Sequence, residues 1–160
     1  MTDGRATSLA CAHMTNDAGA HRGHLAAIVL EYDRIISDLV KAAKDPGFSR
    51  ASWAPLEHLI AVEEFERAGI LRETMNWEQY VDFLTKWAAS KEFSTTLRRI
   101  NEVPPLVYYE VEEHHTMGEE TKVINSMSVF EFDEAGKTRH LDVYLQGQLY
   151  APGSLPNYVT

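Results

Sequence analysis

The sequence predicts an α+β fold in which N-terminal helices pack in a curved, mainly antiparallel β-sheet. Two observations lead to this prediction. Apolar residues recur at helical spacing between residues 23 and 87, whereas a period of two, typical of strands, begins at Phe93. Helices followed by consecutive strands are the order of an α+β domain. A strongly twisted sheet can curl around such helices and leave a cavity between them.

Three helical segments are expected in the first half of the chain. Apolar positions at helical spacing predict a helix over roughly 23–44, and an Asp-Pro-Gly sequence at 45–47 ends it. Proline suits a first helical turn, so a short helical piece is expected to begin near Pro55. Asn76 and Gln79 fit a capping box at the start of a third, amphipathic helix.

Four strands are expected in the second half, near 93–103, 106–117, 122–132 and 138–149. Proline and glycine separate them, and an Asp-Glu-Ala-Gly turn joins the last two into a hairpin. One row of this hairpin carries hydroxyls and large apolar groups and is expected to line a pocket. Its members are Ser126, Ser128, Phe130 and Phe132, with Leu141, Val143 and Leu145 on the second arm. The polar row His140, Asp142 and Tyr144 is expected to face outward.

The composition indicates one soluble globular domain. The chain has 160 residues, of which 44% are hydrophobic and 24% are charged. We expect this domain to span 23–150. Residues 1–22 are small, polar and aperiodic, which predicts a disordered lead. The segment 151–160, with two prolines and a glycine, is expected to be an irregular tail.

Charge and hydropathy exclude several partners. A net charge of −9 without a visible basic patch argues against nucleic acid. No apolar run approaches the roughly 20 residues that span a bilayer, and the N-terminus lacks a secretory pattern. Cys11 is the only cysteine, so no intrachain disulfide can form. A cytoplasmic protein without a membrane partner is therefore expected.

Two acidic positions are candidates for general acid/base chemistry. If residues 60–68 form a strand, Glu63 and Glu64 point to opposite faces, and an interior Glu64 would have a raised pKa suited to a general base. If they continue a helix, both lie on a solvated face. Asp33 sits in the apolar stripe of the first helix, where it is either a buried functional acid or an acid at the edge of the stripe.

A polar cluster covers residues 108–115. Alternation groups Tyr109, Val111, Glu113 and His115 with Val107, which predicts that this set faces the interior. The other set is expected to be a charged, exposed strand face. Two of its members, Glu112 and His114, are too few ligands for a metal, so no metal site is predicted unless His58 joins them as in a metal-dependent hydrolase. No GxSxG or glycine-rich phosphate loop is present, so nucleophilic and nucleotide chemistry lack support.

The order of these elements resembles the NTF2-like superfamily. The first helix, Val62-Glu63-Glu64, the Trp77 helix and the Asp-Glu-Ala-Gly-Lys hairpin follow one another over residues 25–146. The resemblance implies an NTF2-like cone, the α+β fold of SnoaL-like cyclases, ketosteroid isomerases, scytalone dehydratase and limonene epoxide hydrolase. One such fold hosts many chemistries, so function must be argued from the site.

Residue by residue, the resemblance implies specific roles. Glu64 is similar in position to the catalytic aspartate of the isomerases. The pair Tyr32 and Asp33 is similar to a tyrosine–aspartate pair on the first helix of scytalone dehydratase, and Glu113 lies near a histidine of that enzyme. Ser128 stands where the isomerases hold a protonated aspartate, and Val143 stands where the epoxide hydrolase has an acid. These two departures argue against steroid isomerisation and against a paired-carboxylate hydrolysis.

The predicted function is a cofactor-independent lyase or isomerase acting on a hydrophobic cyclic or aromatic molecule. Glu64 or Asp33 would abstract a proton, and isomerisation, dehydration or retro-aldol C–C cleavage would follow. Tyr32, His115 or Ser128 would stabilise the oxyanion. The alternative is a non-catalytic module of the same fold that binds a hydrophobic ligand or assembles with a partner. A homo-oligomer, dimer or trimer, is expected because Met127, Val129 and Tyr144 lie among charged residues on the outer face.

Overall fold

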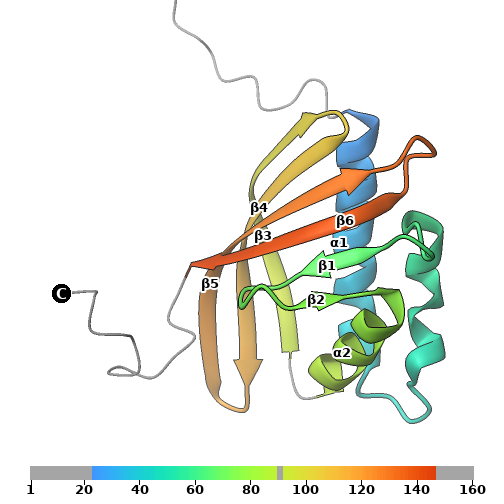
Figure 1. Cartoon of the computed structure of the whole chain (residues 1–160). Helices are drawn as coiled ribbons and strands as arrows, with labels where there is room; N and C mark the ends of the chain where they lie inside the picture. The colour runs from blue at the N-terminus through green and yellow to red at the C-terminus, as the bar shows by residue number, and fades with distance from the viewer. Residues whose placement is uncertain (1–22, 90–91, 147–160) are drawn as a thin grey trace, which may run out of the picture.

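Three helices and a six-stranded mixed sheet make up the described part of the chain, residues 23–89 and 92–146, in the computed structural model (Figure 1). The helices are α1 (His24–Ala42), the 3₁₀ helix η1 (Arg50–Leu59) and α2 (Trp77–Ala89). The strands are β1 (Glu66–Ala68), β2 (Thr74–Met75), β3 (Glu92–Val103), β4 (Leu106–Met117), β5 (Glu120–Phe132) and β6 (Thr138–Gln146). The expected lead (1–22), the tail (151–160) and Cys11 lie outside the described residues.

Helix α1 forms as its apolar spacing predicts. Its buried stripe includes Val29, Tyr32 and Ile36, which pack in the core against the sheet. The first turn of a helix has backbone N–H groups without helical partners. Here the carboxylate of Glu102 on β3 accepts a hydrogen bond of 2.8 Å from the Ala26 amide. This contact, together with the packing of α1 on β3, fixes the helix across the sheet.

The segment between α1 and α2 differs from both sequence alternatives. The helical piece begins at Arg50 and not near Pro55, because Ser49 and Ser52 form a capping box at its start. After η1, the chain is neither a continued helix nor one strand. Ile60 bridges to Thr138 on β6, residues 62–64 form a turn, and β1 is only three residues long.

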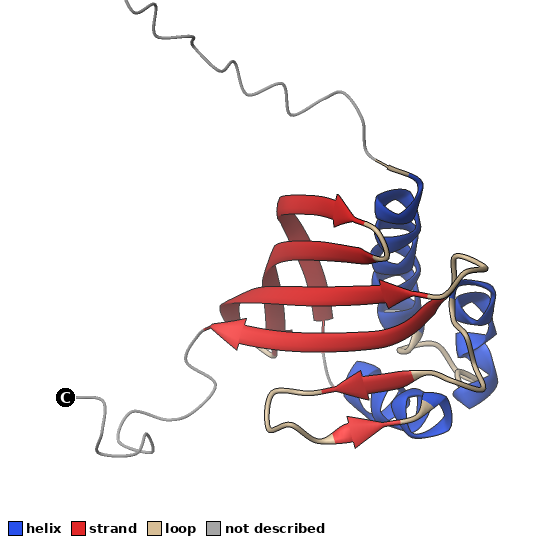
Figure 2. Ribbon diagram, turned by 45° about the horizontal axis from the view of Figure 1, so that its top comes forward, coloured by secondary structure: helices blue, strands red, loops and turns tan. Residues whose placement is uncertain are grey.

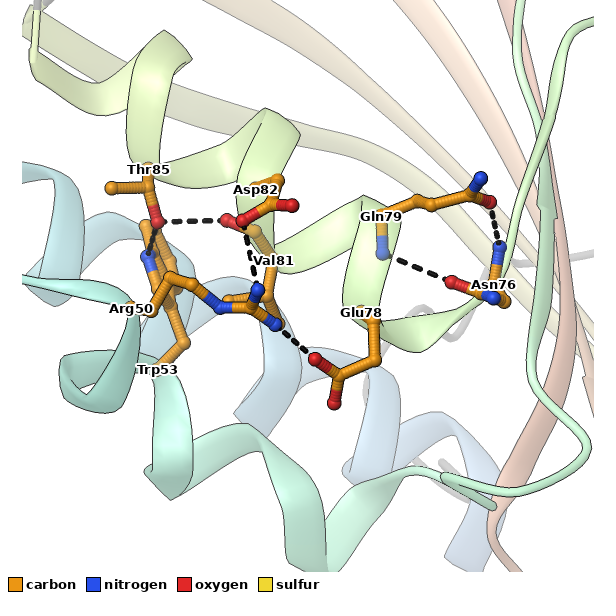
Figure 3. A network of polar contacts seen from close by, with 8 residues as sticks. All are labelled: Arg50, Trp53, Asn76, Glu78, Gln79, Val81, Asp82 and Thr85. Atoms are coloured by element: carbon orange, nitrogen blue, oxygen red, sulfur yellow. Dashed lines mark hydrogen bonds and ion pairs between the residues drawn. The ribbon is translucent and has the colours of Figure 1, made fainter.

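The capping box of α2 is confirmed. The Asn76 side chain accepts from the Gln79 amide and the Gln79 side chain accepts from the Asn76 amide, each at 3.0 Å (Figure 3). Figure 3 also shows how α2 is held to η1. Arg50 of η1 forms ion pairs with Glu78 and Asp82 of α2, and the indole N–H of Trp53 donates to Thr85 at 3.0 Å.

The sheet has the strand order β2-β1-β6-β5-β4-β3, and every neighbouring pair is antiparallel except β1 with β6. The predicted mainly antiparallel sheet is thus confirmed, with β1 and β2 as additional short strands. The hairpin turn uses Gly136 at a φ of +74°, which favours glycine. Figure 2 shows the sheet curving, with the helices on one side of it. A register shift between Leu97 and Arg99 interrupts the β3–β4 ladder, and such irregularities bend strands.

The core fills the concave side of the sheet. Its largest fully buried side chains are Trp53, Phe130 and Leu56, which come from η1 and β5. Burial of this apolar surface is the main force that holds the helices against the sheet. Within the described ranges, none of the helices has the length and apolar character that crossing a bilayer requires.

Candidate active site

A cavity of about 520 Å³ opens between α1, α2, the short strand β1 and the inner face of the sheet. Its volume lies in the range of small-molecule binding sites. Most of its wall is apolar, and the polar groups come from α1, α2, the β1–β2 segment and the strands β3, β4 and β5. The polar lining residues that matter for chemistry are Tyr32, Asp33, Arg67, Glu73, Tyr80, Thr95, Tyr109, Glu113 and His115.

Asp33 is the carboxylate that α1 contributes to the cavity. Its Oδ2 accepts a hydrogen bond of 2.8 Å from the Thr95 hydroxyl on β3. Burial raises the pKa of Asp33 because the charged form loses hydration, and nearby Glu113 adds to this effect, while hydrogen bonding from Thr95 and Tyr109 opposes it. A desolvated carboxylate with a raised pKa is a stronger base than an exposed one. Asp33 is therefore equipped to abstract a proton.

Two tyrosines from different helices form a hydrogen-bonded pair in the wall. The hydroxyl oxygens of Tyr32 on α1 and Tyr80 on α2 are 2.5 Å apart. Burial raises the pKa of both hydroxyls, so both keep their protons near neutral pH. One proton joins the two oxygens, and the second stays available to another acceptor. Such a pair can donate a hydrogen bond to an oxygen that becomes negatively charged.

A carboxylate and an imidazole from β4 occupy another part of the wall. Glu113 Oε2 and His115 Nε2 are joined by a hydrogen bond of 2.8 Å. The His115 ring is buried against Trp87 and Phe93, with ring centroids 6.2 and 5.2 Å away. The sequence-predicted interior row of β4 is thus correct, since Tyr109 and Val111 also line the cavity.

Solved structures share this architecture at low sequence identity. A proposed SnoaL-like polyketide cyclase from Shewanella putrefaciens CN-32 is 9% identical, with a TM-score of 0.61 over 78% of this chain and 91% of that chain. An NTF2-like protein of unknown function from Cytophaga hutchinsonii is 16% identical, with a TM-score of 0.53 over 80% and 95%. A limonene-epoxide-hydrolase-like (LEH-like) epoxide hydrolase from M. tuberculosis is 14% identical, with a TM-score of 0.52 over 73% and 84%.

The chain has the NTF2-like fold. Its sequence matches no protein-family model and none of the curated proteins. Identities this low show the fold alone, so the chemistry of this NTF2-like cone has to be argued from its own cavity.

Most residues of the hairpin row that the sequence predicts as a pocket wall do line the cavity. Its cavity-lining members are Ser128, Phe130, Leu141, Val143 and Leu145. Ser126 and Phe132 do not line the cavity. The short side chain of Ser126 is buried between the longer Val111 and Leu145 on the neighbouring strands. Phe132 pairs with Thr138, to which Ile60 also forms a parallel β-bridge, and Phe132 belongs to the packed core.

The predicted placement of Glu64 is wrong. Glu64 is exposed in the turn formed by residues 62–64, outside the cavity of the cone. The prediction required a strand that continues through this position, and the turn removes the alternation on which it depended. The likeness to the isomerases' catalytic position therefore does not place Glu64 at the site, and Asp33 is the acid that α1 contributes.

The outward polar row is correctly assigned away from the cavity. His140 contacts Glu66 at 3.5 Å and Asp142 at 3.2 Å, and Tyr144 is 58% exposed. The three residues of the metal-hydrolase alternative do not converge. His58 pairs with Glu31, His114 contacts Thr96 and Glu112 pairs with Arg98. In the part of the chain that the structure describes, no three histidine, cysteine or acidic side chains form a metal-binding cluster.

Arg67, Glu73, Tyr80 and Thr95 are cavity residues that the sequence did not single out. Tyr80 lies on the apolar face of the amphipathic third helix, where the sequence indicates core packing. Arg67 lies in the segment 60–68 whose sequence fits both a strand and a solvated helix face; in the structure Phe65 and Arg67 are buried while Glu66 between them is exposed. This alternation is one of burial in the folded strand β1, which is too short for the sequence pattern to mark Arg67.

Proposed function

We propose that this protein is a cofactor-independent general acid/base enzyme, a lyase or isomerase, acting on a hydrophobic cyclic or aromatic small molecule. The proposal rests on Asp33. Its carboxylate is half-buried in an apolar cavity, and burial raises the pKa of this group. The low-identity neighbours, which include a proposed polyketide cyclase and an epoxide hydrolase, are compatible with a catalytic role.

The first step is removal of a proton from the carbon next to a carbonyl group. Asp33 takes the proton, and the Tyr32–Tyr80 pair donates a hydrogen bond to the carbonyl oxygen as it becomes an enolate. Thr95 holds the Asp33 carboxylate in one orientation through its hydrogen bond of 2.8 Å. Return of the proton to another carbon completes an isomerisation.

Loss of a leaving group from the enolate would instead complete a dehydration. His115, hydrogen-bonded to Glu113, lies in the same cavity and can give a proton to a departing hydroxyl group when it is protonated. In a retro-aldol cleavage Asp33 would take the proton of a hydroxyl group, and the C–C bond would break toward the enolate. All three outcomes use the same base and the same oxyanion donors.

The apolar wall binds the body of the substrate. The side chains that form it are Phe83, Trp87, Val111, Phe130, Leu141 and Val143. They exclude water from the reacting atoms, which strengthens each hydrogen bond in the cavity.

Isotope exchange tests the proton abstraction before the natural substrate is known. The protein is incubated in D₂O with 1-tetralone, 2-indanone and 2-cyclohexenone, and deuterium uptake next to the carbonyl is followed by NMR. We expect catalysed exchange of at least one ketone. Asp33→Asn should slow it by at least about 10²-fold, the usual minimum contribution of a general base.

Asp38→Asn is the matched control, because Asp38 is an exposed acid on the same helix, paired with Arg34 at 3.0 Å. It should exchange at the wild-type rate. Full exchange by a folded Asp33→Asn variant would refute the role of Asp33. Binding of all three ketones without any exchange would favour the non-catalytic, ligand-binding module of the same fold.

We further propose that the protein is a homo-oligomer. The outer face of the sheet exposes Tyr144, Tyr108 and Val123 among charged side chains, and Met127 and Val129 are half-buried there. Light scattering at micromolar concentration measures the mass directly. A monomeric mass would contradict this proposal.

A further inference from the structure

Arg67 is a buried cation in the wall of the cavity. It lies at the centre of β1, where it pairs with Leu141 of β6, and only 8% of the residue is exposed. Arginine is rarely buried to this degree unless its charge is paired. The partners of its guanidinium therefore decide whether the group is structural or is ready for a ligand.

Aromatic rings hold the guanidinium in place. It lies 5.5 Å from the ring centroid of Tyr80 and 5.2 Å from that of Phe83, both on α2. Such contacts stabilise a cation without using its N–H groups. The guanidinium is thus positioned by α2, whose Tyr80 side chain also hydrogen-bonds with it.

The protein leaves one nitrogen of the guanidinium without a hydrogen-bond partner. Nη1 of Arg67 is buried and has no hydrogen-bond partner. The nearest carboxylate, Glu73, is 3.7 Å from Nη1, which is too far for a hydrogen bond, and its side chain is 40% exposed. Its other oxygen already accepts from the Leu71 amide at 2.9 Å. A purely structural arginine would be expected to have a direct, hydrogen-bonded partner.

We propose that Arg67 binds the carboxylate of the substrate, so that the cavity takes an aromatic or polycyclic carboxylic acid. This inference rests on the proposed function, because it specifies the substrate class for the same cavity. A substrate carboxylate would supply the hydrogen-bond acceptor that Nη1 lacks, together with a charge of opposite sign. The surrounding Leu141, Val143 and Phe83 contact the apolar ring system that carries it.

The position of Arg67 also orients the substrate. The lysine of the lining, Lys122, lies near the far end of β5 opposite His115 and is exposed. Arg67, by contrast, is next to Tyr80. A carboxylate on Arg67 therefore places the neighbouring carbonyl group beside the Tyr32–Tyr80 pair, with Asp33 beyond it on α1.

Calorimetry with a matched pair of probes tests the proposal. The probes are 2-naphthoate and its neutral methyl ester, which share the ring system and differ in charge. We expect the wild-type protein to bind the acid at least about 10-fold more tightly than the ester, as a charge-assisted hydrogen bond would give. Arg67→Gln should remove this preference while leaving ester binding within about 2-fold.

Arg139→Gln is the matched control, because Arg139 is an arginine on the neighbouring strand β6 that pairs with Glu131 outside the cavity. It should keep the wild-type preference. If circular dichroism shows that Arg67→Gln does not fold, the proposal is tested on Arg67→Lys and on the wild-type protein, each with the acid and the ester. Arg67→Lys should still prefer the acid to the ester, but less strongly than the wild-type protein does. A wild-type protein that binds both probes equally, or a folded Arg67→Gln variant with unchanged preference, would overturn the proposal.

Isotope exchange and calorimetry on the same variants together distinguish this inference from the proposed function. Asp33→Asn should lose isotope exchange but keep the preference for the acid, because Asp33 does not hold the carboxylate. Exchange that persists in Asp33→Asn together with a preference that depends on Arg67 would refute the catalytic assignment alone. Exchange that depends on Asp33 without any preference for the acid would refute the role of Arg67 alone.

Discussion

The hydroxyl oxygens of Tyr32 and Tyr80 lie 2.5 Å apart and join α1 to α2 in the wall of the cavity. The two residues are 48 positions apart in the sequence, and each helix places its tyrosine on a buried face. Arg67 lies over the Tyr80 ring, and Asp33 follows Tyr32 on α1. The pair therefore connects the proposed base with the proposed carboxylate-binding residue.

Tyr80→Phe should weaken catalysis more than folding. The ring contacts remain, but the Tyr32 hydroxyl loses its partner, which costs about 1–3 kcal/mol of unfolding free energy. Isotope exchange should fall at least about 10-fold, because the enolate loses part of its hydrogen bonding. Urea unfolding and NMR exchange measure the two effects. Tyr108→Phe, at an exposed tyrosine outside the cavity, should change neither.

The pH profile of exchange should report the titration of Asp33. The base is active only when deprotonated, so the rate should rise with pH through an apparent pKa above the usual aspartate value of about 3.9. Thr95→Val should move this apparent pKa higher still, since it removes a hydrogen bond that favours the carboxylate. A profile with an ordinary aspartate pKa would argue against Asp33 as the base.

The free energy of unfolding should also depend on pH through Asp33, and the raised pKa of this residue sets the direction of the change. Because the folded-state pKa of Asp33 is raised, the native protein binds more protons than the unfolded chain between the unfolded and the folded pKa. The contribution of Asp33 to stability therefore falls as pH rises through this window. Asp33→Asn should remove that fall, so the variant should be more stable than wild type near neutral pH. Chemical denaturation at several pH values checks this, and a variant that loses stability on raising the pH as wild type does would contradict it.

Phe130→Ala should affect both the core and the cavity. Phe130 is almost fully buried and meets the rings of Tyr32 and Tyr109 edge-on, at 5.2 and 6.4 Å. Removing a buried phenyl ring typically costs about 3–5 kcal/mol of unfolding free energy. Val123→Ala, at a side chain of the same strand that is 54% exposed, should stay within about 0.5 kcal/mol of wild type. Similar losses in the two variants would mean that Phe130 is not packed as described.

Glu64→Gln should leave exchange and stability unchanged. Glu64 is exposed in a turn outside the cavity, and surface substitutions of this kind usually change the unfolding free energy by less than about 0.5 kcal/mol. The comparison with Asp33→Asn separates the two acids that the sequence offered as bases. A large loss of exchange in Glu64→Gln alone would return the catalytic role to that residue.

Sequence periodicity by itself determined α1, α2 and the strands β3 to β6, together with most of their faces. The stripe on α1 predicted a helix that buries Tyr32, and the alternation on β4 placed Glu113 and His115 on the inner face. The hairpin row was correct at Ser128, Phe130, Leu141 and Val143. These successes share a cause: within one regular helix or strand, local spacing decides which side chains share a face.

Only the tertiary structure decided which of these faces line the cavity. Ser126 and Phe132 share the face of Ser128, yet Ser126 is buried between longer neighbours on the adjacent strands and Phe132 belongs to the packed core. Glu64 and Arg67 lie where the chain turns and then forms a strand of three residues, too short for a reliable pattern. Their placement depends on the pairing of β1 with β6, a contact between segments more than 70 residues apart. Local spacing carries no information on such a contact, so the exposure of Glu64 and the burial of Arg67 emerged only from the folded chain.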